Sequence, residues 1–179
     1  GATDPDTTPP TFGGITGLTA LNPTSVMLSW APAKDDVTPT TGIVYLVYLR
    51  GGTGYDFTKP TYTTAAGATS YTVNGLAPKA KVTYVVRARD AAGNIDANVV
   101  ELTTSTPADT TAPSFTGISS INAVTSTSLT VNFPLATDDV SAQNKIVYKI
   151  CLSTAATQCN DSDVAWGTAL TVTGLTGAN

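Results

Sequence analysis

The sequence predicts an all-β protein built from two antiparallel β-sandwiches in tandem. Its 179 residues contain 13 acidic side chains, of which Glu101 is the only glutamate. Aspartate favours turns and caps whereas glutamate favours helices, so this bias, together with many Thr and Val residues, indicates strands joined by aspartate-bearing loops. Apolar residues recur at every second position, and one long segment is repeated. The chain is long enough for two domains of about 100 residues, each with its own core.

The repeat opens with "DTTPPTFGG" at Asp6 and with "DTTAPSFTG" at Asp109. A shift of 103 residues, the distance from Asp6 to Asp109, aligns the two copies without a gap as far as Leu49. "YTVNGL" then matches "LTVTGL" at a shift of 99 residues, the distance from Tyr71 to Leu170. Repeats of this length indicate tandem domains, which we place at residues 1–107 and 108–179.

Three segments of the first copy, "SVMLSW", "IVYLVYL" and "VTYVVRA", have apolar residues at every second position. This period of two predicts strands with one buried face. The buried positions are expected to be Val26, Leu28 and Trp30, then Ile43, Tyr45, Val47 and Leu49, and finally Val82, Tyr84, Val86 and Ala88. Turn sequences separate the strands, as in a seven-stranded antiparallel sandwich, and "GGTGYDF" is predicted to be one of these turns.

The segments "SVMLSW", "YLVYLR", "TSYTVNGLAP" and "VVRARDAAGN" resemble strands B, C, E and F of a fibronectin type III domain, in the form common in bacterial secreted proteins. The resemblance implies an immunoglobulin-like sandwich and covers the chain once completely and once in part. Val82 stands where that family usually has a tyrosine. The crossing from strand E to strand F is therefore expected to be held by Pro78 and apolar packing.

The second copy ends soon after "LTVTGL", without a counterpart of Lys81–Thr104. By comparison with the first copy it lacks strands F and G, so half of its core and one edge of strand C would face water. Three explanations remain open: the native chain continues, the missing strands come from another molecule, or this copy is partly unfolded.

In a sandwich of this family the start of strand A and the B–C and F–G loops lie at one pole, so aspartates distant in sequence are expected to converge there. Several oxygen-bearing side chains from different loops suit Ca²⁺, which takes six to eight oxygen ligands. The candidate metal ligands are Asp6, Asp35, Asp36, Asp90 and Asn94 in the first copy, and Asp109, Asp138 and Asp139 in the second. The alternative is that these residues only cap loops, because Asp accepts backbone N–H bonds in turns. Bound at Asp109, a cation would also stiffen the interdomain linker.

The two cysteines, Cys151 and Cys159, are too few for a zinc site in a chain without histidine. They are predicted to form a local disulfide, which implies an oxidising, extracellular or cell-surface location. Two buried free thiols are the alternative.

Composition also limits the function. A net charge of −4 gives no basic stripe for nucleic acid, no apolar run is long enough for a membrane span, and the lack of histidine excludes catalytic triads. The aspartates have no aromatic platform near them in sequence, so glycoside hydrolysis is not expected. Trp30 is expected in the core, whereas Trp166 remains open as a carbohydrate-stacking residue.

We therefore expect a non-enzymatic extracellular spacer, stalk or assembly unit, whose partners are other domains of its own polypeptide or neighbouring copies. One alternative is an accessory module that binds polysaccharide for a polysaccharide-degrading enzyme. Another is an extracellular filament subunit whose second domain is closed by strands from a neighbour.

Overall fold

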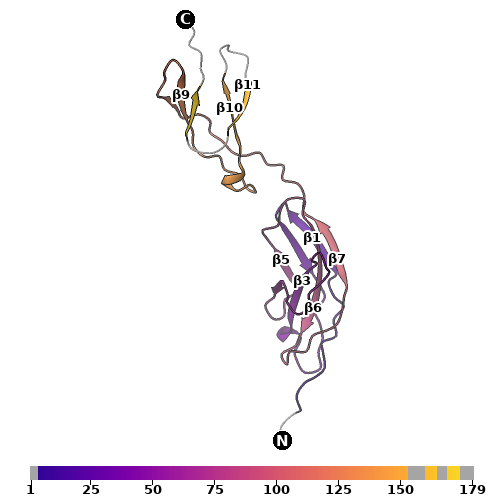
Figure 1. The fold of residues 1–179 in the computed structure, drawn as a ribbon. Coiled ribbons are helices and arrows are strands. Elements are labelled where there is room, and N and C mark those ends of the chain that lie inside the picture. The colour runs from indigo at the N-terminus through magenta and orange to yellow at the C-terminus, as the bar shows by residue number, and fades with distance from the viewer. Residues whose placement is uncertain (1–3, 153–159, 165–168, 174–179) are drawn as a thin grey trace. The chain divides into compact units, whose positions relative to one another are not determined.

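The computed structural model describes residues 4–152, 160–164 and 169–173. The chain forms two compact units, Gly1–Asp109 and Thr110–Asn179 (Figure 1). The predicted all-β fold is confirmed, since both units are built from antiparallel strands. Helical structure in the described residues is limited to the 3₁₀ turns η1 (Thr40–Gly42) and η2 (Gln143–Lys145).

The first unit consists of two antiparallel sheets. The first sheet has the order β1 (Gly17–Asn22), β2 (Ser25–Ser29), β5 (Ser70–Val73). The second has the order β4 (Tyr62–Thr63), β3 (Val44–Leu49), β6 (Lys81–Arg89), β7 (Glu101–Ser105). The turn between β1 and β2 is closed by Asn22, whose Oδ1 accepts hydrogen bonds from the backbone N–H and the hydroxyl of Thr24 at 2.9 and 3.1 Å.

The core of this unit is formed by the alternating residues of β2, β3 and β6. Of the predicted inward positions, Val26, Leu28, Trp30, Ile43, Tyr45, Val47, Val82, Tyr84, Val86 and Ala88 are all buried in one cluster. Leu49 was wrongly placed among them, since it lies at the end of β3 and is exposed. Trp30 is buried as expected, and its ring N–H donates to the carbonyl of Ala68 at 3.0 Å.

The expectation that β3 buries only one face is wrong, and on the outer face of β6 Val85 is buried while the other residues are partly or fully exposed. Leu46, Tyr48 and Val85 point to the opposite face, yet they are only 2%, 1% and 0% exposed. The segment after β3 folds back over this face, and its Phe57 ring packs edge-on against Tyr48 at 5.1 Å between ring centroids. The "GGTGYDF" segment is therefore a cover for the sheet as well as a turn.

The crossing from β5 to β6 is held by hydrogen bonds in addition to the expected apolar packing, in which Leu76 contacts the core cluster. Thr106, which is buried, donates its hydroxyl to the carbonyl of Ala77 at 2.8 Å and accepts the N–H of Ala80 at 2.9 Å. Its backbone N–H bonds the carbonyl of Ala80 at 3.0 Å. A threonine that follows β7 thus ties this crossing by hydrogen bonds.

The second unit has one sheet of order β12 (Ala169–Thr173), β9 (Ser128–Asn132), β8 (Ser120–Asn122), and one of order β10 (Tyr148–Leu152), β11 (Asn160–Val164). The pairings described for β10 are all with β11. Among the described residues of the second unit, the buried core consists of Val131, Phe133, Ala136, Ile146 and Tyr148.

The assignment of this unit as an incomplete sandwich stays a prediction. The predicted Cys151–Cys159 disulfide and Trp166 lie outside what the structure describes. No helix in the described ranges has the length and hydropathy that crossing a bilayer requires.

Candidate cation-binding sites

Three aspartates from three separate segments of the first unit meet at one end of the sandwich. Asp6 lies in the N-terminal segment, Asp35 in the loop between β2 and β3, and Asp90 directly after β6. Each offers a carboxylate oxygen, and the three oxygens lie within 4.8 Å of one another. The bridge between Thr11 and Lys34 holds the first two segments side by side, with backbone N–O distances of 2.7 and 3.0 Å.

Two of these carboxylates also organise their own loops. Asp6 Oδ1 accepts the backbone N–H of Thr8 at 3.0 Å. Asp35 Oδ2 accepts the N–H groups of Val37 and Thr38 at 3.1 and 2.8 Å. These bonds are the ones that loop capping predicts, because the short Asp side chain reaches amides two or three residues ahead.

Asp90 is the most buried member of the cluster and the one with most hydrogen bonds. Its Oδ1 accepts the N–H groups of Gly93 and Asn94 at 2.6 and 2.7 Å, and its Oδ2 accepts Asn94 Nδ2 at 2.7 Å. Burial tends to raise the pKa of Asp90, but the hydrogen bonds from Asn94 and the neighbouring amides outweigh it and lower that pKa below its ordinary value. Asp90 is thus held as a carboxylate.

Asn94 lies within the cluster and acts there as a donor. The same Nδ2 that bonds Asp90 also donates to the backbone carbonyl of Asp6 at 3.2 Å, which links the loop between β6 and β7 to the N-terminal segment. Asp36 does not join the three carboxylates: it is exposed and lines a neighbouring shallow hollow together with Lys34.

Loop capping leaves part of the cluster unexplained. Asp6 Oδ2 and Asp35 Oδ1 are buried, and no described atom hydrogen-bonds either of them. Buried carboxylate oxygens are normally hydrogen-bonded or bound to a cation, since an unpaired one is costly. Ca²⁺ takes six to eight oxygen ligands, so three carboxylates would supply only part of such a set, and backbone carbonyls and water would have to supply the rest.

The second unit repeats the arrangement seen at Asp35. Asp138 Oδ1 accepts the N–H groups of Val140 and Ser141 at 3.0 and 2.5 Å, while its Oδ2 is buried and bonded to no described atom. The backbone bonds from Ser141 and Val140 lower the pKa of Asp138. Asp139 is exposed and accepts the Thr111 hydroxyl at 3.4 Å. Asp109 is the last residue of the first unit, so its predicted grouping with Asp138 and Asp139 stays a prediction.

A polar and aromatic cluster on the outer face of the four-stranded sheet was not predicted. Arg50 and Glu101 form a salt bridge at 2.8 Å, and Tyr55 donates its hydroxyl to Glu101 at 2.9 Å. The Tyr55 and Phe57 rings stack at 5.5 Å, and the guanidinium of Arg87 lies 3.4 Å from the centroid of Phe57. Burial, followed by the bond to Glu101, raises the pKa of Tyr55 to about 12. The sequence signal that could have indicated this cluster is the pair of aromatic residues in "GGTGYDF", Tyr55 and Phe57, which are separated by one residue.

The seven strands of the first unit, in the sheet orders β1-β2-β5 and β4-β3-β6-β7, define a β-sandwich module of the immunoglobulin-like class. The family described as "Fibronectin type III domain" matches residues 8–101, which is more than half of the sequence. The chain belongs to the fibronectin type III domain family.

Relatives were found among bacterial enzymes. The chain is 37% identical to exoglucanase B of Cellulomonas fimi over 155 residues, which are 84% of this chain and 13% of that protein. It is 31% identical to chitinase A1 of Niallia circulans over 176 residues, which are 95% of this chain and 22% of that protein. The chain therefore spans less than a quarter of the length of either relative.

Among solved structures, a two-domain fibronectin type III segment of chicken tenascin is 19% identical. It matches with a TM-score of 0.46 over 92% of this chain and 85% of that one.

Proposed function

We propose that this chain is a non-catalytic spacer region of a larger extracellular polysaccharide-degrading enzyme. The observation that carries the proposal is that the relatives are enzymes with different substrates. Their names cover exoglucanases, chitinases and an α-amylase, and the chain matches between 7% and 22% of the length of those proteins. A segment shared by enzymes with such different substrates does not determine substrate or chemistry, which depend on the site that carries them.

We further propose that both units are fibronectin type III domains in tandem. Support comes from details that recur in both. Tyr45 Oη accepts the N–H of Ala33 at 2.8 Å, and Tyr148 Oη accepts the N–H of Ala136 at 2.6 Å. The repeated Asp35 and Asp138 loops are a second recurring detail.

Calcium is the proposed ligand of the Asp6–Asp35–Asp90 cluster. Ca²⁺ is a hard cation that prefers carboxylate and carbonyl oxygens, and its weak extracellular sites bind with dissociation constants of about 10⁻⁴ to 10⁻³ M. Three loops that contribute one carboxylate each would be joined by such an ion, so binding would stabilise this end of the sandwich.

The spacer proposal is tested with the purified chain and insoluble cellulose and chitin. A spacer releases no reducing sugar from either polymer and remains in the supernatant after centrifugation. Release of reducing sugar that is lost on Asp35→Ala or Asp90→Ala replacement would contradict the proposal, because those carboxylates would then be catalytic.

Polysaccharide binding is the second candidate function, and the Tyr55–Phe57 stack favours it. Both rings are only partly buried, and they lie beside the polar side chains of Arg50 and Glu101, a combination that suits a sugar ring. Binding through this face predicts depletion of the chain from the supernatant, loss of depletion in Tyr55→Ala, and retention in Tyr55→Phe. The phenylalanine variant is the matched control because it keeps the ring.

A further inference from the structure

Two tyrosine rings meet between the edges of the two sheets of the first unit. Tyr62 lies on β4, an edge strand of the four-stranded sheet, and Tyr71 lies on β5, an edge strand of the three-stranded sheet. Their ring centroids are 5.3 Å apart, and the ring planes are inclined by 34°. Direct aromatic contacts have centroid separations of about 4.5–7 Å. The pair therefore bridges the two sheets.

Strand pairing sets the direction of both rings. Tyr62 is opposite Val47 in the β3–β4 ladder. Tyr71 is opposite Leu28 in the β2–β5 ladder. Directly paired residues of an antiparallel ladder point to the same side of their sheet, and Val47 and Leu28 belong to the buried core. Both tyrosines consequently point between the sheets, where they pack against the core and stay partly exposed at its margin.

The exposed margin leaves both phenol groups open to oxidation. Neither hydroxyl is buried, and neither takes part in a hydrogen bond with a described residue, so water is available to accept their protons. We propose that Tyr62 and Tyr71 form an oxidative cross-linking site, at which hydrogen peroxide activated by a haem peroxidase joins the two rings by a carbon–carbon bond. The product is a dityrosine that ties β4 covalently to β5.

The peroxide balances the reaction. Each phenol gives up one electron and one proton and becomes a phenoxyl radical, and these electrons and protons reduce one hydrogen peroxide to two molecules of water. The radicals then form a bond between carbons ortho to their oxygens. The hydrogen that each of these carbons carried moves to the phenolic oxygen, which restores two aromatic phenols. The chain loses two hydrogen atoms in total.

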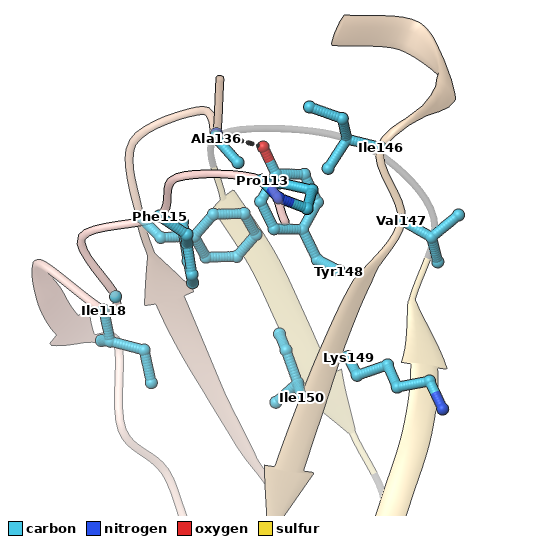
Figure 2. A pocket seen from close by; sticks show the side chains of 11 residues that line it. Pro113, Phe115, Ile118, Ala136, Ile146, Val147, Tyr148, Lys149 and Ile150 are labelled. Carbon is cyan, nitrogen blue, oxygen red and sulfur yellow. Dashed lines mark hydrogen bonds between the residues drawn. The ribbon is translucent and has the colours of Figure 1, made fainter. Parts of the chain in front are cut away.

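The surroundings of the other tyrosines make the reaction selective. All seven tyrosines of the chain lie in the described ranges, and the ring contact between Tyr62 and Tyr71 is the one described there that joins two tyrosines. Tyr148 is buried, and its hydroxyl accepts the N–H of Ala136, as Figure 2 shows. Tyr55 stacks on a phenylalanine and donates its hydroxyl to a carboxylate.

Tyr84 is the competing partner closest to this pair. It lies near enough to Tyr62 for the two groups to interact electrostatically, yet it is fully buried and its hydroxyl has no hydrogen-bond partner in the described part of the chain. Burial raises the pKa of Tyr84 to about 12. Oxidation of Tyr84 would leave a proton without an acceptor in the core, where an unpaired charge is costly.

The test oxidises the full 179-residue chain with haem peroxidase and hydrogen peroxide, at a protein concentration low enough to favour reaction within one molecule. The expected product is a monomer with the blue fluorescence of dityrosine, and its mass under denaturing conditions is lower by two hydrogen atoms. Elastase cleaves after the alanines between the two tyrosines, which are Ala65, Ala66 and Ala68. The digest should therefore contain the Tyr62 peptide joined to the Tyr71 peptide.

Conservative variants test the assignment. Tyr71→Phe keeps the ring and its packing but has no phenol to oxidise, so the yield of cross-linked monomer should fall to background. Tyr62→Phe should behave in the same way. Tyr55→Phe is the matched control, because the Tyr55 ring contacts Phe57 rather than a tyrosine, and the yield should not change.

The stability of the product tests the connection between the sheets. A bond between β4 and β5 constrains the unfolded chain as a disulfide does, so oxidation should raise the urea midpoint of the unmodified chain. It should leave the midpoint of Tyr71→Phe unchanged. The proposal is overturned if no cross-linked monomer forms, if the joined peptides are not those of Tyr62 and Tyr71, if Tyr71→Phe retains the product, or if Tyr55→Phe loses it.

Discussion

Thr106 illustrates how one buried side chain can secure a whole crossing. Its hydroxyl donates to the carbonyl of Ala77 and accepts the N–H of Ala80, both of which lie in the connection between β5 and β6. The pattern of apolar residues gives no indication of this, because threonine is common in strands and loops alike. The same holds for the carboxylates at the pole, whose importance depends on which of their oxygens remain unpaired.

Replacement of Thr106 by valine should lower the free energy of unfolding by about 1–3 kcal/mol, since the buried Thr106 hydroxyl loses its hydrogen bonds to the Ala77 carbonyl and from the Ala80 N–H. Urea unfolding of the whole chain measures the change. Thr103→Val is the control, because Thr103 is exposed and the hydrogen bond described for its hydroxyl is to the Thr83 hydroxyl on the same surface. Equal effects of the two variants would contradict the role of Thr106.

Calcium at about 1–10 mM should raise the melting temperature of the chain, because a ligand that binds only the folded state stabilises it. Asp35→Ala should abolish the shift, whereas Asp36→Ala should keep it, since Asp36 lies outside the cluster. Differential scanning calorimetry with and without calcium provides the measurement. No shift in the unmodified chain, or a full shift in Asp35→Ala, would rule out this site.

The pH dependence of stability should carry a contribution from Asp90. Its pKa is lower in the folded chain than in the unfolded chain, where it is about 3.9. The stabilisation is therefore complete above the unfolded pKa and is lost as the pH falls through the folded pKa. Asp90→Asn should be less stable than the unmodified chain at pH 7, and the difference should shrink in acid. Urea midpoints between about pH 2 and pH 7 give this comparison; a constant difference would contradict it.

Which faces of a strand are buried depends on the segments that pack around it as well as on its own sequence. β3 was expected to be amphipathic, but the chain that follows it covers its second face. Alternation predicts which residues share a face; it does not predict whether a distant or flanking segment will bury the other face. The stacking of Arg87 on Phe57 adds a contact between β6 and this cover.

Phe57→Ala should expose the outer face of β3 and lower the free energy of unfolding by about 1.5–3 kcal/mol, the value for burying an aromatic side chain. Chemical denaturation measures it, and faster hydrogen exchange at Tyr48 would locate the effect. Glu101→Gln serves as the control. It breaks a half-exposed salt bridge, so it should change stability by only about 0–1 kcal/mol. If Phe57→Ala left the free energy of unfolding unchanged, the segment after β3 would not stabilise the sheet.

The chain contains a first unit with two sheets around one core and a second unit whose described core residues are fewer. All seven strands and the core cluster of the first unit lie within residues 1–109. We expect a fragment of residues 1–109 to fold alone with a single cooperative transition. Overlay of its amide spectrum on that of the full chain tests this, and a broad transition or poorly dispersed spectrum would contradict it.

The fold could be predicted in large part and the candidate site in part. The inward positions of β2 and β6 follow from alternation, which is a local property of an extended backbone. The convergence of Asp6, Asp35 and Asp90 was expected only through the resemblance to a fold that brings those loops together. That Asp36 stays outside, and that Asn94 acts as a donor, depend on side-chain orientation within loops, where no periodicity applies.

The sequence alone determined that this chain forms antiparallel strands, that it repeats itself, and that it has no histidine chemistry, because alternation, repeats and composition can be read without knowledge of distant contacts. Only the tertiary structure decided that β3 is buried on both faces, that Thr106 ties a crossing and that three carboxylate oxygens, on Asp6, Asp35 and Asp138, lie buried with no hydrogen bond from a described atom. These features arise where segments tens of residues apart meet, and the free energy of each contact depends on the partner that folding brings to it.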